Sequence, residues 1–149
     1  MREQLSAQLK DAMKGGDKER VSTIRLIQSA INDRDIANRG TGKDAAAEDE
    51  ILQILAKMVK QREESAAIYQ KAGRLDLATK EQSEIAIIRG FMPQQLGDDE
   101  VQAIARNLIA ELGASGVRDM GKVMAAMRER HAGQMDFAKA SSVVKGLLG

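Results

Sequence analysis

Residues able to do chemistry are sparse in this sequence. His131 is the only histidine and cysteine is absent, so histidine-based metal clusters, disulfides and thiol nucleophiles are excluded. His131 lies near the end of an expected helix, where a surface position or a contact with the helix dipole accounts for it. No Gly-x-Ser-x-Gly elbow is present to expose a serine nucleophile. The sequence therefore predicts no catalytic residue, no metal and no cofactor.

One segment matches the spacing of a phosphate-binding loop but lacks its chemistry. Gly116 is followed by four residues and then by Gly121-Lys122. Val123 stands where such a loop needs a Ser or Thr to hold magnesium. A phosphate loop also follows a β-strand, whereas an amphipathic helix is expected before Gly116. We therefore expect no nucleotide binding and no enzymatic activity of the chain alone.

Two acidic clusters have a structural explanation. The runs Glu48-Asp49-Glu50 and Asp98-Asp99-Glu100 both fall where a helix is expected to begin. Carboxylates in a first turn interact favourably with the unpaired N–H groups and the positive end of the helix dipole. Neither cluster is therefore interpreted as a metal site or an acid/base pair.

Gly121 is the residue that most needs an explanation, because Gly inside a helix costs about 1 kcal/mol relative to Ala. On a helical wheel it lies on one side with Ala125, Arg128 and Lys122, away from the apolar stripe. Small residues beside basic ones leave room for the backbone of a binding partner, and Arg130 adds a further cation. Gly121 is equally explained by packing within the chain or by its place at the helix start. From residue 118 onward six Lys or Arg stand against three acidic residues, a local charge of +3.

Composition limits the choice of partners. The chain has 23 Lys and Arg against 22 Asp and Glu, which gives a net charge of +1. A net charge this small creates no overall electrostatic field that attracts nucleic acid or an acidic membrane. Only three aromatic residues are present, so a base-stacking platform cannot be built. The longest apolar run, residues 85–88, is too short for a membrane span or a signal peptide. A cytoplasmic location is the resulting expectation.

The secondary-structure elements that position these residues are all expected to be helices, because residues with high helix propensity dominate and proline occurs only at Pro93. Apolar stripes at helical spacing indicate helices before Gly15, from Asp17 to about Gly40, from about Ala46 to Ala72, and from there to about Phe91. The turn around Gly73 is short enough to make the last two an antiparallel pair. That pairing brings Arg62, which lies on an apolar stripe, level with Glu81 and Glu84, so we expect a partly buried ion pair.

Pro93 indicates a domain boundary, because it disfavours a helix both at its own position and before it. The predicted organisation is an N-terminal domain of antiparallel long helices at 1–92, a linker at 93–97 and a small three-helix domain at 98–149. Asp98 and Asp136 are expected to cap the first and last helices of that domain. The fold class is therefore all-α.

Motifs spread over almost the whole chain resemble the YqeY-like proteins. They are Lys10-Asp11-Ala12-Met13-Lys14, Arg25-Leu26, Lys60-Gln61-Arg62-Glu63, Ser65, Tyr69, Ala72-Gly73-Arg74, Asp76-Leu77-Ala78, Glu81, Glu84-Ile85, Pro93 and Asp119-Met120-Gly121-Lys122-Val123-Met124. The chain departs from the family pattern at Asn32 and Gln134, where the family often has basic residues. The family's C-terminal domain is similar to the tRNA-contacting tail of the B subunit of the tRNA-dependent amidotransferase.

The resemblance implies a tRNA-related function, and three hypotheses follow. In the first, the chain is a noncatalytic, tRNA-associated accessory protein whose C-terminal domain contacts tRNA or a tRNA-handling complex. In the second, it is a protein-interaction adaptor that binds another helix and no RNA. In the third, which rests on family association alone, it assists an amidotransferase, a carbon–nitrogen ligase with glutamine as amido donor.

Overall fold

The path of the chain is described for all residues, 1–149, in a computed structural model. It forms seven α-helices, one short 3-10 turn and no strand, which confirms the predicted all-α class. The elements are α1 (Arg2–Lys14), α2 (Lys18–Gly40), α3 (Glu48–Lys71), α4 (Leu75–Arg89), α5 (Asp98–Leu112), η1 (Val117–Asp119), α6 (Met120–Arg130) and α7 (Phe137–Leu148). None of the helices has the length and apolar character that crossing a membrane requires.

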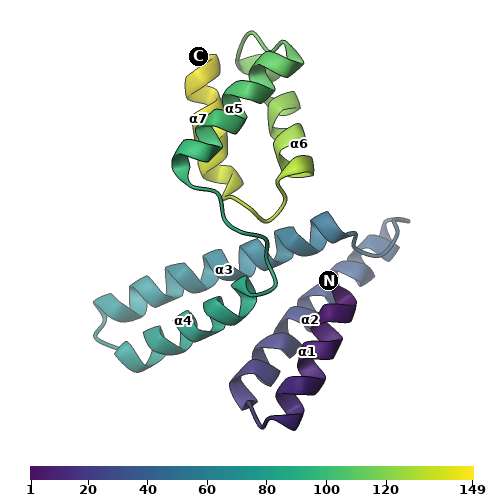
Figure 1. The fold of residues 1–149 in the computed structure, drawn as a ribbon, viewed down its shortest axis with the longest axis vertical. Helices are drawn as coiled ribbons and strands as arrows, with labels where there is room; N and C mark the ends of the chain where they lie inside the picture. Colours follow the sequence, from purple (N-terminus) through teal and green to yellow (C-terminus); the bar gives the residue numbers. More distant parts are fainter. The chain divides into compact units, whose positions relative to one another are not determined.

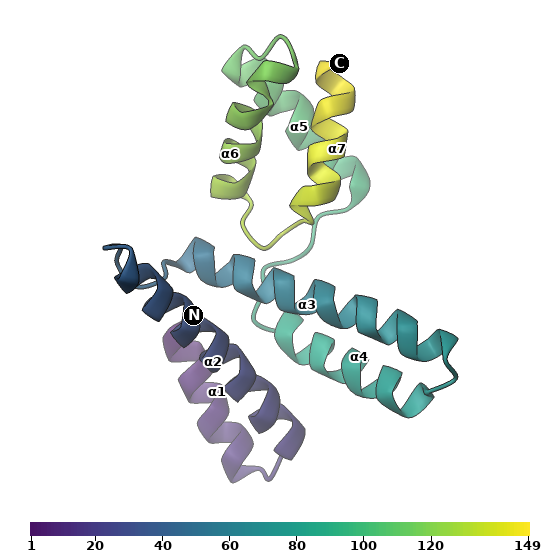
Figure 2. The same cartoon turned by 180° about the vertical axis from the view of Figure 1, so that it is seen from behind.

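The chain divides into two compact units, Met1–Met92 and Pro93–Gly149, and each has a core of its own. In the first unit α1 and α2 form one helical hairpin and α3 and α4 form a second (Figures 1 and 2). Their apolar stripes meet in a core that includes Leu5, Ile24, Ile27, Ile31, Ile51, Leu55, Ile85, Ile88 and Phe91. The helical spacing of these residues explains why the segments fold as helices and why the hairpins pack together.

Local signals set the turns of the N-terminal unit. The side chain of Asp17 accepts a hydrogen bond from the backbone N–H of Arg20 at 3.1 Å, so Asp17 caps the start of α2. Between α3 and α4 the chain reverses at Gly73, whose φ of +74° lies in the left-handed region that glycine adopts without strain.

An ion pair between Arg62 and Glu84 joins the two helices of the second hairpin. Nε of Arg62 donates to Glu84 Oε2 at 2.8 Å, and Nη1 donates to the backbone carbonyl of Met58 at 3.2 Å. The two charged side chains are only 15% and 13% exposed. Glu81, the alternative partner considered from the sequence, makes no such contact. The pair therefore satisfies a guanidinium that the apolar stripe of α3 largely buries.

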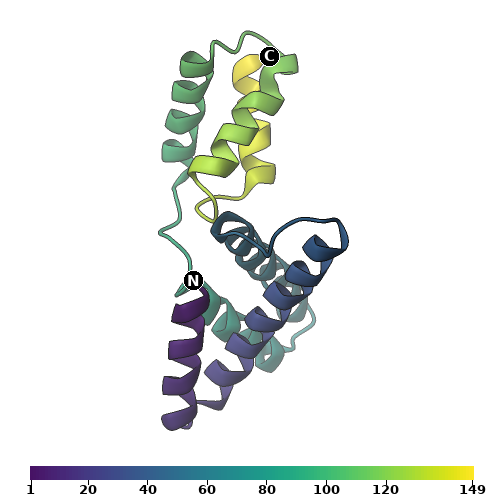
Figure 3. The same ribbon diagram turned by 90° about the vertical axis from the view of Figure 1, so that its right-hand side faces the viewer.

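The C-terminal unit consists of α5, α6 and α7, which lie beside one another in Figure 3. Their shared core includes Val101, Ala105, Leu108, Val123, Met124, Met127, Met135, Ala140 and Val144. Asp136 caps α7 as predicted, accepting from the backbone N–H of Ala138 at 2.9 Å. The prediction for Asp98 is wrong. The N-cap of α5 is Gly97, Asp98 is the first helical residue, and Glu100 accepts from the Gly97 backbone N–H at 3.1 Å.

The connecting segment predicted at 93–97 is bonded into the C-terminal unit. The backbone N–H of Leu96 donates to the carbonyl of Gln134 at 2.8 Å, and the side chain of Gln95 donates to the carbonyl of Gly133. Leu96 also packs against the core of this unit. These contacts run to the loop between α6 and α7, a distant part of the sequence, so local composition gave no sign of them.

Replacing Arg62 with Ala should destabilise the protein by about 2–3 kcal/mol, because Glu84 would remain partly buried without its cation. Urea unfolding followed by circular dichroism measures the loss. The matched control is Arg89→Ala, which removes an ion pair with Glu63 between the same two helices, where both side chains are about half exposed. That control should cost less than about 1 kcal/mol. Equal losses in the two variants would show that burial of the Arg62 pair contributes nothing.

A fragment of residues 93–149 should fold alone with a cooperative thermal transition, because its three helices close a separate core. A fragment of residues 97–149 should melt at a lower temperature, since it lacks Leu96 and the hydrogen bond to Gln134. Circular dichroism on both fragments tests this. A non-cooperative melt of the longer fragment would contradict the prediction.

Candidate functional site

Helix α6 places one apolar face in the core and leaves the opposite face open to solvent. Val123, Met124 and Met127 are buried at 0–4% exposure. Four residues on the other side are all exposed, and we call this surface the α6 face: Gly121, Lys122, Ala125 and Arg128. The grouping predicted from the helical wheel is therefore the one that the helix presents.

Gly121 is not required by packing within the chain. A Cβ atom placed on it would meet no heavy atom within 4 Å. Its backbone is helical, without the positive φ that would select glycine. Close packing within the chain therefore does not explain why position 121 is a glycine. Two explanations remain: its place in the first turn of α6, and close approach of a binding partner to this surface.

The cations near the α6 face differ in what they bind. Lys122 makes no hydrogen bond to a carboxylate. The nearby Asp119 accepts a hydrogen bond from the backbone N–H of Ser115 at 3.0 Å, and this bond, with a smaller effect from the charge of Lys122, lowers the pKa of that carboxyl. Arg128 lies over the ring of Phe137, 5.8 Å from its centre, and has no carboxylate partner. Lys122 and Arg128 thus keep their hydrogen-bond donors available to an anion.

Arg130, which the sequence placed in the same candidate site, is instead bound to Glu111 of α5. Its Nη1 and Nη2 donate to the two carboxylate oxygens at 2.8 and 2.9 Å, and these bonds lower the pKa of Glu111. This bidentate pair links α6 to α5 across the unit. Arg130 thus has a carboxylate partner, and the α6 face proper has Lys122 and Arg128 as its cations.

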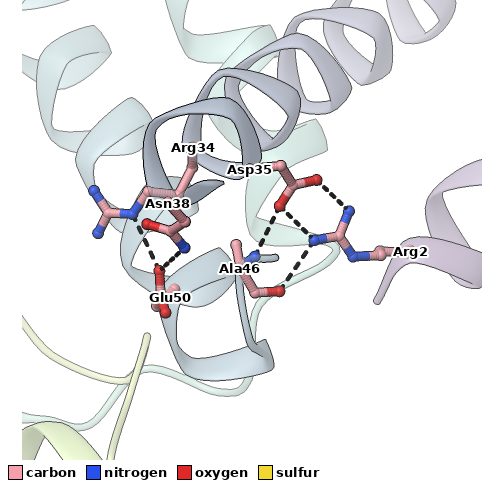
Figure 4. A network of polar contacts seen from close by, with 6 residues as sticks. All are labelled: Arg2, Arg34, Asp35, Asn38, Ala46 and Glu50. Atoms are coloured by element: carbon pink, nitrogen blue, oxygen red, sulfur yellow. Dashed lines mark hydrogen bonds and ion pairs between the residues drawn. The ribbon is translucent and has the colours of Figure 1, made fainter. Parts of the chain in front are cut away.

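A second polar cluster, in the N-terminal unit, was not anticipated from the sequence (Figure 4). Asp35 of α2 accepts two hydrogen bonds from Arg2 of α1, each at 2.9 Å, and one from the backbone N–H of Ala46 at 2.8 Å. Arg2 also donates to the carbonyl of Ala46 at 3.0 Å. Both backbone groups of Ala46 are engaged in this way, and α3 begins at Glu48, two residues after the start predicted at about Ala46.

One turn further along α2, Asn38 donates to Glu50 at 3.0 Å and Arg34 donates to the same oxygen at 3.2 Å. Those two bonds lower the pKa of Glu50, with the Asn38 amide as the larger cause. The sequence signal for both contacts is that Asp35 and Asn38 continue the buried stripe of Ile27 and Ile31 at helical spacing. A polar residue on such a stripe indicates a polar partner in the fold.

The carboxylates of these polar clusters accept hydrogen bonds from within the N-terminal unit, and this disfavours a role in proton transfer. Arg2 is the largest influence on Asp35, and with the Ala46 N–H it lowers the pKa of that carboxyl to about 2. A carboxylate so well satisfied is a poor proton carrier near neutral pH. No three side chains of the His, Cys, Asp and Glu types lie close enough together to hold a metal ion.

The amino-acid sequence matches a known protein family over both helical units. A model of the family described as "Yqey-like protein" matches residues 2–148. The chain belongs to the YqeY-like family. Its motifs in both helical units are those through which the sequence resembled this family.

Several curated fungal proteins are related to the chain. An uncharacterized protein of Schizosaccharomyces pombe is 36% identical over 86 residues, which cover 58% of this chain and 67% of that protein. The protein named "Altered inheritance of mitochondria protein 41, mitochondrial" is 30% identical in Lachancea thermotolerans over 97% of this chain and 76% of its own length. The protein of that name in Pyrenophora tritici-repentis is 26% identical, covering 97% and 79%. The name of the Lachancea and Pyrenophora proteins assigns those two relatives to mitochondria, whereas a cytoplasmic location was expected for this chain.

Acid should destabilise the N-terminal unit through Asp35. Its pKa of about 2 in the folded protein lies below the value of about 4 for an unfolded Asp, so its contribution is complete above pH 4 and disappears toward pH 2. We expect Asp35→Asn to melt below the parent protein at pH 7, with a difference that narrows as the pH falls through this range. Thermal melts from pH 7 to pH 2.5 measure it.

The control is Asp33→Asn. Asp33 lies two residues before Asp35 on α2, and its carboxylate is exposed and makes no hydrogen bond or ion pair. Its melting difference from the parent should stay small at every pH. A gap between the parent and Asp35→Asn that is independent of pH would contradict the assignment.

Proposed function

We propose that this YqeY-like protein is a noncatalytic, tRNA-associated accessory protein whose C-terminal unit contacts the RNA backbone through the α6 face. The observation that carries the proposal is the combination on this face of two cations that make no hydrogen bond to a carboxylate and a low surface between them. Gly121 and Ala125 let a backbone approach closely, while Lys122 and Arg128 supply hydrogen-bond donors for phosphate. The resemblance of this unit to the tRNA-contacting tail of an amidotransferase subunit supports the same interpretation.

The contact should be weak and should carry little sequence information. Only two cations of the α6 face are available, because Arg130 is bound to Glu111. Phe137 lies under the guanidinium of Arg128, so it does not offer a bare ring to a base. Recognition would therefore depend on phosphate contacts and on the shape of the RNA, which is how proteins read folded and double-stranded RNA.

A second function, a protein-interaction adaptor, is favoured by the same open glycine. Small residues at positions 121 and 125 are one turn apart and allow another helix to lie close against α6. In that case Lys122 and Arg128 would pair with carboxylates of the partner. The two functions differ in their ligand, so a direct binding measurement separates them.

Fluorescently labelled bulk tRNA should bind the full chain at low salt, measured by anisotropy. Neutralising two phosphates gives a slope of about −2 for log affinity against log salt. The double variant Lys122→Glu with Arg128→Glu should abolish the signal, because it replaces both available donors with negative charge.

The matched control is the double variant Lys57→Glu with Arg106→Glu, which makes the same charge change at two exposed residues of other helices. It should retain binding within about threefold, since distant surface charges are largely screened. Circular dichroism establishes that both variants are folded. Absence of any tRNA binding by the folded parent chain at low salt would reject the RNA function and leave the adaptor.

A further inference from the structure

A hollow lies on the surface of the N-terminal unit at the turn between α1 and α2. Its volume is about 680 Å³, enough for a few apolar side chains. Ala12 and Met13 at the end of α1 and Val21 and Leu26 of α2 give it an apolar lining. The hairpin that forms it is visible in Figures 1 and 3.

The apolar residues of this hollow are not explained by the core. Met13 is 54% exposed and Leu26 is 45% exposed, while the buried residues of α2, such as Ile24 and Ile27, lie on its other side. Large apolar side chains that line one concave surface are typical of a binding site, unlike apolar residues scattered singly. Both belong to stretches that carry the family resemblance, Lys10 to Lys14 and Arg25-Leu26, and the proposed function uses neither stretch.

The charged residues that line the hollow are both cations. Lys18 and Arg25 are part of its lining, both are exposed, and neither forms an ion pair. No carboxylate contributes to the lining. Glu19 lines an adjoining depression that shares Lys18 and Ser22 with the hollow, so Arg25 is the cation that only the hollow uses. A ligand in the hollow therefore meets an apolar floor with positive charge beside it.

We propose that this hollow is a docking site for an acidic amphipathic helix of a partner protein. Apolar side chains of that helix would fill the space beside Met13 and Leu26, and its carboxylates would pair with Lys18 and Arg25. This is the usual manner in which an amphipathic helix binds in an apolar groove. Charge complementarity selects the partner, because a neutral or basic helix would leave both cations unpaired.

The same observations disfavour other occupants. A second copy of this chain, joined through the hollow by a two-fold axis, would bring Lys18 and Arg25 of one copy toward the same residues of the other. RNA offers phosphates to the cations but nothing to fill the apolar floor. The proposal concerns a unit and residues that the tRNA hypothesis does not involve, so each can fail without the other.

The test uses a synthetic helical peptide of about 15 residues, with Leu on one face and Glu on the flanks, labelled and titrated with the full chain. A peptide of the same composition with the Leu residues scattered around the helix is the control ligand. We expect the amphipathic peptide to bind more tightly and its affinity to fall with salt. Leu26→Asp and Arg25→Glu should each weaken binding about tenfold.

Two substitutions of the same kinds serve as controls outside the hollow. Ile68→Asp alters an apolar residue that is 66% exposed on α3, and Lys57→Glu reverses an exposed charge on the same helix. Both should bind the peptide like the parent, and thermal melts establish that all four variants are folded.

Equal binding of the two peptides, or unchanged binding by folded Leu26→Asp and Arg25→Glu, would overturn the proposal. Sedimentation velocity adds a second criterion. A dimer of the parent chain that Leu26→Asp converts to a monomer would assign the hollow to a second copy and equally overturn the acidic partner. Loss of tRNA binding in Arg25→Glu, with peptide binding intact, would assign this surface to RNA.

Discussion

Asp35 receives hydrogen bonds from two segments of the N-terminal unit that are far from it in sequence. Arg2 brings the start of α1 to α2, and Ala46 brings in the loop before α3. Helix α1 packs mainly against α2, so this contact and the turn at Gly15 to Asp17 fix the two ends of its hairpin. One carboxylate therefore joins α1, α2 and the loop before α3.

The helices and their faces were predictable because they depend on local spacing. Three kinds of feature follow from residues within a few positions of one another: the stripes that contain Ile27 and Met127, the caps Asp17 and Asp136, and the exposed side of α6. The contacts that the sequence did not reveal join residues far apart, such as Arg130 with Glu111 and Gln134 with Leu96. Their partners depend on the register between helices. The error at Asp98 is local, because Gly97 takes the N-cap position and Glu100 accepts a hydrogen bond from its backbone N–H.

Net charge describes this protein poorly because five of its twelve arginines pair with a carboxylate of another helix. They are Arg2, Arg34, Arg62, Arg89 and Arg130. The net charge of +1 therefore does not distinguish cations that pair with a carboxylate of another helix from cations that face solvent without such a partner. Only the second group bears on binding, and in the C-terminal unit the α6 face brings two of them beside an open glycine.

The start of α6 has a further consequence for motion. This helix begins without a side-chain hydrogen bond at its N-cap and has Gly121 in its first turn, and both features lower local helix stability. Its middle, around Met127, is fully buried. Backbone amides at the start of α6 therefore exchange with solvent through smaller openings than those near Met127. Gly121 and Lys122 of the α6 face lie in this first turn, so a ligand bound to them would slow amide exchange at the start of α6 without any change of fold.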